Sequence, residues 1–228
     1  MSTPYEKYAI YADSVSKQFN TQAGTLTLFT HLNLAIDHGD TVAIVGPSGA
    51  GKSTLLSLLS GLDTPSNGHV YINGNSTDSL SEQARAKLRA EDIGFIFQTF
   101  HLLPELSAFD NLMLPLEIAN TANPEALATE WLTKVGLGDR MHHLPNQLSG
   151  GEQQRVAIAR AFVCSPNILF ADEPTGNLDE TTGNEIADQL FALNKDQNTT
   201  LVLITHDPAL AAKCHKQYRL KQGTLEAL

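Results

Sequence analysis

Three things are scarce in this sequence: cysteine, basic residues and long apolar runs. The two cysteines, Cys164 and Cys214, lie far apart and form no C-x-x-C unit, so neither a disulfide framework nor a cysteine metal site is expected. Lys and Arg total 15 against 25 Asp and Glu, and the formal net charge of −10 disfavours nucleic acid as a partner. The N-terminus lacks the apolar run of a signal peptide, and no apolar stretch approaches the length of a membrane span, so a cytoplasmic location is expected.

What the sequence does contain is a phosphate-binding motif. Residues 46–54 contain the pattern G-x-x-x-x-G-K-[ST], which lies between a short apolar run that predicts a strand and a run that predicts a helix. Lys52 supplies a positive charge for phosphates, and Ser53 supplies a hydroxyl for Mg²⁺. The alternative, a plain glycine-rich turn, needs no Lys-Ser pair at this spacing. The predicted phosphate contacts are Gly46, Ser48, Gly49, Ala50, Gly51, Lys52, Ser53 and Thr54.

Four polar or flexible residues directly follow predicted buried strands. These residues are Gly46, Gln98, Asp172 and His206. Strands that alternate with helices predict a largely parallel sheet, and ligands bind beyond the carboxyl ends of such strands. Asp172 could hold Mg²⁺ through its water shell, although an acid at a strand end is also a common helix cap. Glu173 could deprotonate a water that attacks the terminal phosphate, or it could be a plain surface acid.

The middle of the chain changes character. From residue 99 to about residue 144 the strand signals stop, and prolines separate helical pieces, which predicts an inserted helical subdomain over residues 99–155. Residues 1–98 and 156–228 are then expected to form the core, with short antiparallel strands near the N-terminus. Trp131 is expected to pack inside the subdomain rather than hold a ligand. His142 and His143 are expected to be surface residues rather than metal ligands, because no third ligand is nearby.

The stretch Ser149-Gly150-Gly151-Glu152 opens a predicted helix and has two interpretations. Ser149 and Glu152 have the spacing of a capping box. A serine and two glycines at a helix start also expose N–H groups to an anion. Both interpretations can hold at once.

Together, these motifs resemble the ATPase subunit of an ABC transporter over nearly the whole chain. The run 170–179 is similar to the subgroup of lipoprotein-releasing, macrolide-efflux and cell-division ABC ATPases, and residues 85–90 and 147–161 resemble one bacterial member that works with a large permease. The resemblance implies an α/β P-loop NTPase fold. Such a fold has a mainly parallel sheet, an N-terminal antiparallel β subdomain and an inserted α-helical subdomain.

The resemblance also implies roles for individual residues. Phe19 would stack on adenine, where the family more often has Tyr. Gln98 would contact Mg²⁺ or its water, and His206 would contact the γ-phosphate. Asp179 would lie in a loop that crosses to a second subunit. Ser149, Gly150 and Gly151 would bind the γ-phosphate of the ATP that the other subunit holds.

The function implied is hydrolysis of ATP by a homodimer that encloses two ATP–Mg²⁺ and drives a separate permease in the bacterial inner membrane. The permease would hold the chain at the inner face of that membrane. Residues 99–106, which directly follow Gln98, are expected to form part of the dock for the permease, although their apolar side chains could instead fill the helical subdomain. A soluble ABC protein of DNA repair or translation, a small-molecule phosphotransferase and a mechanical signalling ATPase are the alternatives.

Overall fold

A computed structural model describes residues 5–21 and 24–228, which fall into two compact units. The first unit takes in Met1–Arg89 and Thr199–Leu228, and the second is Ala90–Asn198. The predicted helical subdomain, residues 99–155, falls inside the second unit, and its limits stay a prediction.

The N-terminal part of the first unit is an antiparallel sheet with the strand order β2-β1-β4-β5. Its strands are β1 (Tyr8–Thr21), β2 (Gly24–Asp37), β4 (Asn67–Ile72) and β5 (Asn75–Ser76). The prediction of several short strands before residue 45 was wrong in length, because β1 and β2 each run for 14 residues. Their pairing is interrupted by register shifts, for example between Ala12 and Val15, and these shifts break the apolar alternation into short runs.

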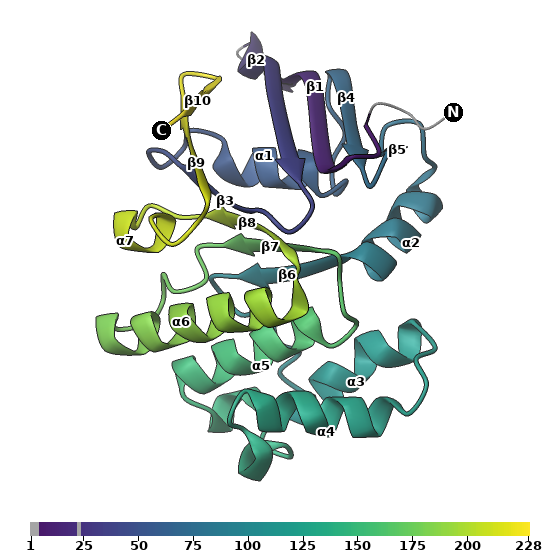
Figure 1. Cartoon of the computed structure of the whole chain (residues 1–228), viewed down its shortest axis with the longest axis vertical. Coiled ribbons are helices and arrows are strands. Elements are labelled where there is room, and N and C mark those ends of the chain that lie inside the picture. The colour runs from purple at the N-terminus through teal and green to yellow at the C-terminus, as the bar shows by residue number, and fades with distance from the viewer. Residues whose placement is uncertain (1–4, 22–23) are drawn as a thin grey trace. The chain divides into compact units, whose positions relative to one another are not determined.

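The remaining strands of the first unit are mainly parallel. They are β3 (Thr41–Val45), β8 (Thr200–Ile204), β9 (Lys216–Lys221) and β10 (Thr224–Ala227). β3 pairs in parallel with both β8 and β9, and β10 is antiparallel to β9. Helix α1 (Lys52–Leu59) contacts β4 and β8 and lies between the antiparallel sheet and these strands (Figure 1), while α7 (Pro208–Ala211) follows β8. Leu55, Leu58 and Leu59 of α1 are fully buried in this arrangement.

The second unit combines two parallel strands with helices. Strand β6 (Ile93–Phe97) follows α2 (Glu82–Asp92) and pairs with β7 (Ile168–Asp172). The other helices are α3 (Ala108–Ile118), α4 (Pro124–Lys134), α5 (Gly150–Phe162) and α6 (Glu180–Gln197), with short 3₁₀ turns at Gly138–Arg140 and Pro145–Gln147. Trp131 is buried and stacks on Phe162 with ring centroids 5.6 Å apart, so its predicted place in the core is confirmed.

In the part of the chain that the structure describes, Cys164 and Cys214 are both free thiols. Among the same residues, no three His, Cys, Asp or Glu side chains gather as a metal site. His142 and His143 lie in a turn between the two 3₁₀ segments. None of the helices in residues 5–21 and 24–228 is both long enough and apolar enough to span a bilayer.

Candidate functional site

The phosphate loop lies between β3 and α1, and its glycines are required by close packing. A Cβ atom on Gly46 would lie 2.4 Å from the carbonyl oxygen of Leu220, and one on Gly51 would lie 2.9 Å from the Phe29 ring. Gly49 and Gly51 also have φ angles of 78° and 94°, a region that other residues rarely adopt. The glycines therefore let the loop close tightly against β9 and β2.

Lys52 folds back over this loop. Its ammonium nitrogen, Nζ, donates hydrogen bonds to the backbone oxygens of Gly46 (2.9 Å) and Pro47 (3.1 Å), and the residue is 8% exposed. Since an ammonium group has three donors, two hold the loop in shape and the third remains for an anion. The positive charge is thus fixed at the mouth of the loop.

The N-terminus of α1 is open toward the same loop. Its N-cap is Gly51, which has no side chain to cap the helix, and the first turn contains no acidic residue. The positive end of the helix dipole therefore faces the loop, where it favours a negative ligand. The donors and the charge present here fit a phosphate group. Ser53, the expected Mg²⁺ ligand, is exposed in this first turn, and Thr54 follows it.

Two other expected site residues lie in the first unit. Ile44 of β3 pairs with Ile204 of β8, so Gly46 and His206 follow neighbouring parallel strands at the same edge. Phe19 lies in β1, is 39% exposed, and has the ammonium group of Lys17 at 5.1 Å from its ring centroid. An exposed aromatic ring with an adjacent cation suits stacking on a base.

The second unit brings together Gln98, Asp172 and Glu173. Phe97 of β6 pairs with Asp172 of β7, so Gln98 and Glu173 are the first residues beyond two adjacent parallel strands. Glu173 has a φ angle of 47°, and its backbone oxygen accepts a hydrogen bond from the N–H of Gly176 at 3.0 Å. A left-handed backbone at a non-glycine residue is uncommon and tends to occur at functional sites.

One residue of this edge was missed by sequence reasoning. The side chain of Asn177 accepts a hydrogen bond from Nε2 of Gln98 (3.1 Å) and donates one to the backbone oxygen of Gln98 (2.9 Å). Asn177 lies within the run 170–179, on which the family resemblance partly rests. Nothing in the sequence alone indicates a pairing over a separation of 79 residues.

The start of α5 contains the capping box that the sequence predicts. The hydroxyl of Ser149 accepts a hydrogen bond from the N–H of Glu152 (3.3 Å), and the N–H of Ser149 donates to the Glu152 carboxylate (2.8 Å). The hydrogen bond that the Ser149 N–H donates to the Glu152 carboxylate, together with the interaction of the Ser149 hydroxyl with that carboxylate, lowers the pKa of Glu152. The role of Ser149 toward an anion stays a prediction, since the capping box leaves other N–H groups of this helix end available.

The two glycines of this stretch pack against the segment that leads into α6. A Cβ on Gly150 would lie 3.3 Å from a methyl group of Leu178, and one on Gly151 would lie 2.6 Å from the methyl group of Thr182. Asp179 caps α6, because its carboxylate accepts a hydrogen bond from the N–H of Thr182 at 3.0 Å, which lowers the pKa of Asp179. The segment 173–179 is thereby held between β7 and the start of α5.

Comparison with known proteins identifies the family. The sequence pattern of the ABC transporter family matches residues 29–176. The chain is 51% identical over 203 residues to the ABC transporter ATP-binding protein YbbA of Escherichia coli strain K12, with 88% of this chain and 89% of YbbA covered. It is 44% identical over 231 residues to the lipoprotein-releasing system ATP-binding protein LolD of Xanthomonas oryzae pv. oryzae, with 100% of this chain and 95% of LolD covered.

Solved structures agree with this result. The dimeric ATP-binding cassette MJ0796 in a post-hydrolysis state bound to ADP and Pi is 39% identical to this chain, with a TM-score of 0.87 and coverage of 95% of this chain and 96% of that one. The predicted fold class, an α/β P-loop NTPase with an antiparallel β subdomain and helices, is confirmed. This chain therefore belongs to the ABC transporter family and is an ATP-binding subunit of the subgroup that contains YbbA and LolD.

Proposed function

We propose that this subunit hydrolyses ATP as a homodimer and drives a separate permease of the bacterial inner membrane. The observation that carries the proposal is the position of Lys52, whose ammonium group is fixed at the mouth of a loop that ends in an uncapped helix N-terminus. Such a combination of an ammonium charge and the positive end of a helix dipole suits the β- and γ-phosphates of ATP.

We propose a role for each of these side chains, in line with the family resemblance. Lys52 and the first turn of α1 would bind the phosphates, and Phe19 would stack on adenine. Ser53, Gln98 and Asp172 are the oxygen-bearing side chains that would hold Mg²⁺, which when bound neutralises phosphate charge. Glu173 would take a proton at its carboxylate from the attacking water. His206 would contact the γ-phosphate.

Dimerisation would complete each site. We expect Ser149, Gly150, Gly151 and Asp179 to face the ATP or the phosphate loop of a second copy. Support comes from the solved relatives, which are dimeric cassettes, and from the helix N-terminus at Gly150, whose dipole favours an anion.

A mixing experiment tests the composite site. Ser149→Arg chains and Lys52→Ala chains should each be inactive alone, because every site of either homodimer lacks one essential part. In an equal mixture, half of the dimers are heterodimers with one intact site each, so about a quarter of the normal ATPase activity should return. Steady-state hydrolysis with a size measurement checks this. Inactive mixtures that demonstrably contain heterodimers would contradict the shared site.

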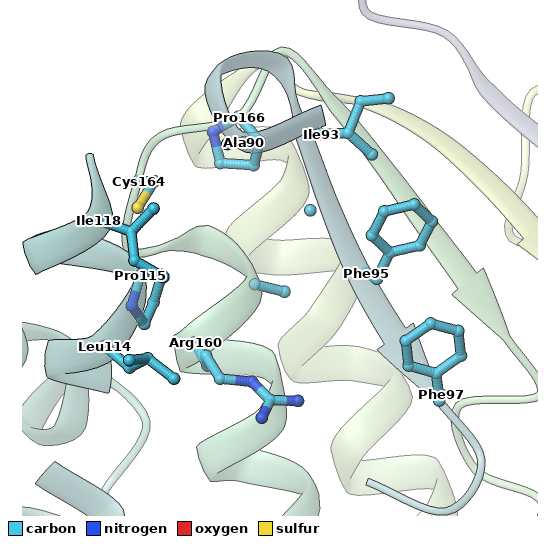
Figure 2. Close-up of a pocket in the computed structure, with 12 residues that line it drawn as sticks. Ala90, Ile93, Phe95, Phe97, Leu114, Pro115, Ile118, Arg160, Cys164 and Pro166 are labelled. Carbon is cyan, nitrogen blue, oxygen red and sulfur yellow. The ribbon is translucent and has the colours of Figure 1, made fainter. Parts of the chain in front are cut away.

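The dock for the permease is proposed on an apolar groove within the second unit. A cavity of about 310 Å³ lies among β6, α3 and α5 (Figure 2), and its walls include Phe95, Leu114 and Ile118. Leu114 and Ile118 are 40% and 65% exposed. An apolar hollow with exposed walls suits an apolar cytoplasmic segment of a membrane protein.

The segment 99–106 supplies further exposed apolar side chains in the second unit. Its apolar residues Phe100, Leu102, Leu103 and Leu106 are half-buried or exposed, and Leu103 is 41% exposed. This exposure favours docking over the alternative in which these side chains fill the helical subdomain.

Replacing Leu103 with Glu should abolish recruitment to native membranes while the protein stays folded. Since Leu103 is 41% exposed, we expect the free energy of unfolding to change by less than about 0.5 kcal/mol. Leu62→Glu is the matched control, because Leu62 is 48% exposed but lies in the first unit. Membrane co-sedimentation beside thermal melting measures both effects. Loss of stability would support the core alternative, and unchanged recruitment would favour a soluble ABC ATPase.

A further inference from the structure

Two hydrogen bonds join Gln98 to Asn177, and their directions are interdependent. The backbone oxygen of Gln98 can only accept, so the atom of Asn177 that contacts it at 2.9 Å must be the amide nitrogen. The other atom of the Asn177 amide is then the oxygen, and it can only accept from Nε2 of Gln98 at 3.1 Å. The backbone carbonyl of Gln98 thus determines, through Asn177, the orientation of the Gln98 side-chain amide.

The consequence concerns the remaining atom of the Gln98 side chain. With Nε2 engaged by Asn177, the oxygen Oε1 is the atom that Gln98 presents elsewhere. An amide oxygen is a ligand for Mg²⁺ or an acceptor for its water, whereas an amide NH₂ group is neither. The orientation that Asn177 enforces is therefore the one suited to a metal.

The backbone around the pair is held from two further directions. A Cβ on Gly176 would lie 2.9 Å from Nε2 of Gln98, so the Gln98 amide occupies the space that a side chain at position 176 would need. Beyond Gln98, the consecutive residues Phe100 and His101 have φ angles of 59° and 50°, and the guanidinium of Arg160 donates to their backbone oxygens at 3.0 and 2.7 Å. The main chain at Phe100 and His101, just beyond Gln98, is thus anchored to α5, and the Gln98 side chain is anchored to Asn177.

We propose that Asn177 is a positioning residue that presents Oε1 of Gln98 for Mg²⁺ coordination. The inference rests on the proposed function, because the role of Gln98 toward Mg²⁺ belongs to it. Asn177 lies between Glu173 and Asp179, so a displacement of this segment would also turn the Gln98 amide.

The test is the Mg²⁺ dependence of ATP hydrolysis. Asn177→Ala should lower kcat about tenfold, which corresponds to the loss of one or two hydrogen bonds, and should raise the Mg²⁺ concentration for half-maximal activity several-fold. Binding of ADP without metal and the melting temperature should not change. Gly176→Ala should have the same effect, because it displaces the Gln98 amide while Asn177 is intact. In a Gln98→Ala background, Asn177→Ala should have no further effect.

The matched control is Asn167→Ala. The amide of Asn167 donates to the carboxylate of Asp92 at 2.6 Å. These two residues directly precede β7 and β6, so this exposed hydrogen bond lies at the starts of the two strands, away from Gln98 and Glu173. It should leave kcat and the Mg²⁺ requirement unchanged. An unchanged Mg²⁺ requirement in Asn177→Ala, or a full additional loss in the Gln98→Ala background, would overturn the inference alone. An unmodified protein that neither binds nor hydrolyses ATP would instead overturn the proposed function.

Discussion

Changing Glu173 to Gln is expected to stop ATP turnover while ATP binding is retained. Glutamine has the same shape as glutamate, so it can occupy the left-handed position after β7 (φ 47°), but its amide cannot accept the proton of the attacking water. General base catalysis contributes about 10²- to 10⁴-fold, and we expect a loss of kcat in that range. Because hydrolysis would no longer separate the two subunits of the ATP-bound dimer, that dimer should accumulate.

Size-exclusion chromatography with ATP and Mg²⁺ measures the dimer, and a single-turnover assay measures the chemical step. Glu180→Gln is the control, because Glu180 is an exposed acid in the first turn of α6 in the same unit. It should keep normal turnover and form no trapped dimer. A Glu173→Gln protein that stays monomeric with ATP and Mg²⁺ would show that the dimer model or the role of Glu173 is wrong.

Lys52→Ala is expected to remove productive nucleotide binding. The substitution deletes the ammonium charge and also the two hydrogen bonds that Nζ donates to the backbone oxygens of Gly46 and Pro47. The loop therefore loses both the charge that would bind phosphate and the hydrogen bonds that hold its shape. We expect kcat/KM to fall by about 10²-fold or more. We also expect ATP to lose its stabilising effect on the melting temperature.

Titration of the melting temperature with ATP separates binding from hydrolysis in this variant. Lys221→Ala, which removes an exposed lysine of β9 in the same unit, controls for the change in net charge. Near-normal hydrolysis by Lys52→Ala would refute the assignment of the phosphate loop.

The sequence predicts those parts of the site that are local in the chain. The phosphate loop is set by glycines and a lysine within nine consecutive positions, and the capping box at Ser149 and Glu152 spans a single helical turn. The strand ends at Gly46, Gln98 and His206 are also predictable, because buried parallel strands have continuous apolar runs. Each of these signals needs only neighbouring residues.

What the sequence leaves open depends on tertiary contacts. The register shifts in β1 make two long strands look like several short ones, since the apolar alternation changes phase at each shift. The pair of Gln98 and Asn177 forms only because β6 and β7 lie side by side, and their separation in the chain gives no sign of it. The family resemblance named the segment around Asn177, but not the direction of its hydrogen bonds.

The stacked pair of Trp131 and Phe162 has a use for spectroscopy. Trp131 is the single tryptophan of the chain, it is 6% exposed, and it lies in the second unit, whereas Lys52 and the phosphate loop lie in the first. Its fluorescence therefore reports on the packing of α4 against α5 without a label or a substitution. Circular dichroism, in contrast, follows the unfolding of both units together. Comparison of the two signals therefore distinguishes a single cooperative unfolding transition from separate unfolding of the first unit, which contains the phosphate loop, and of the helical region.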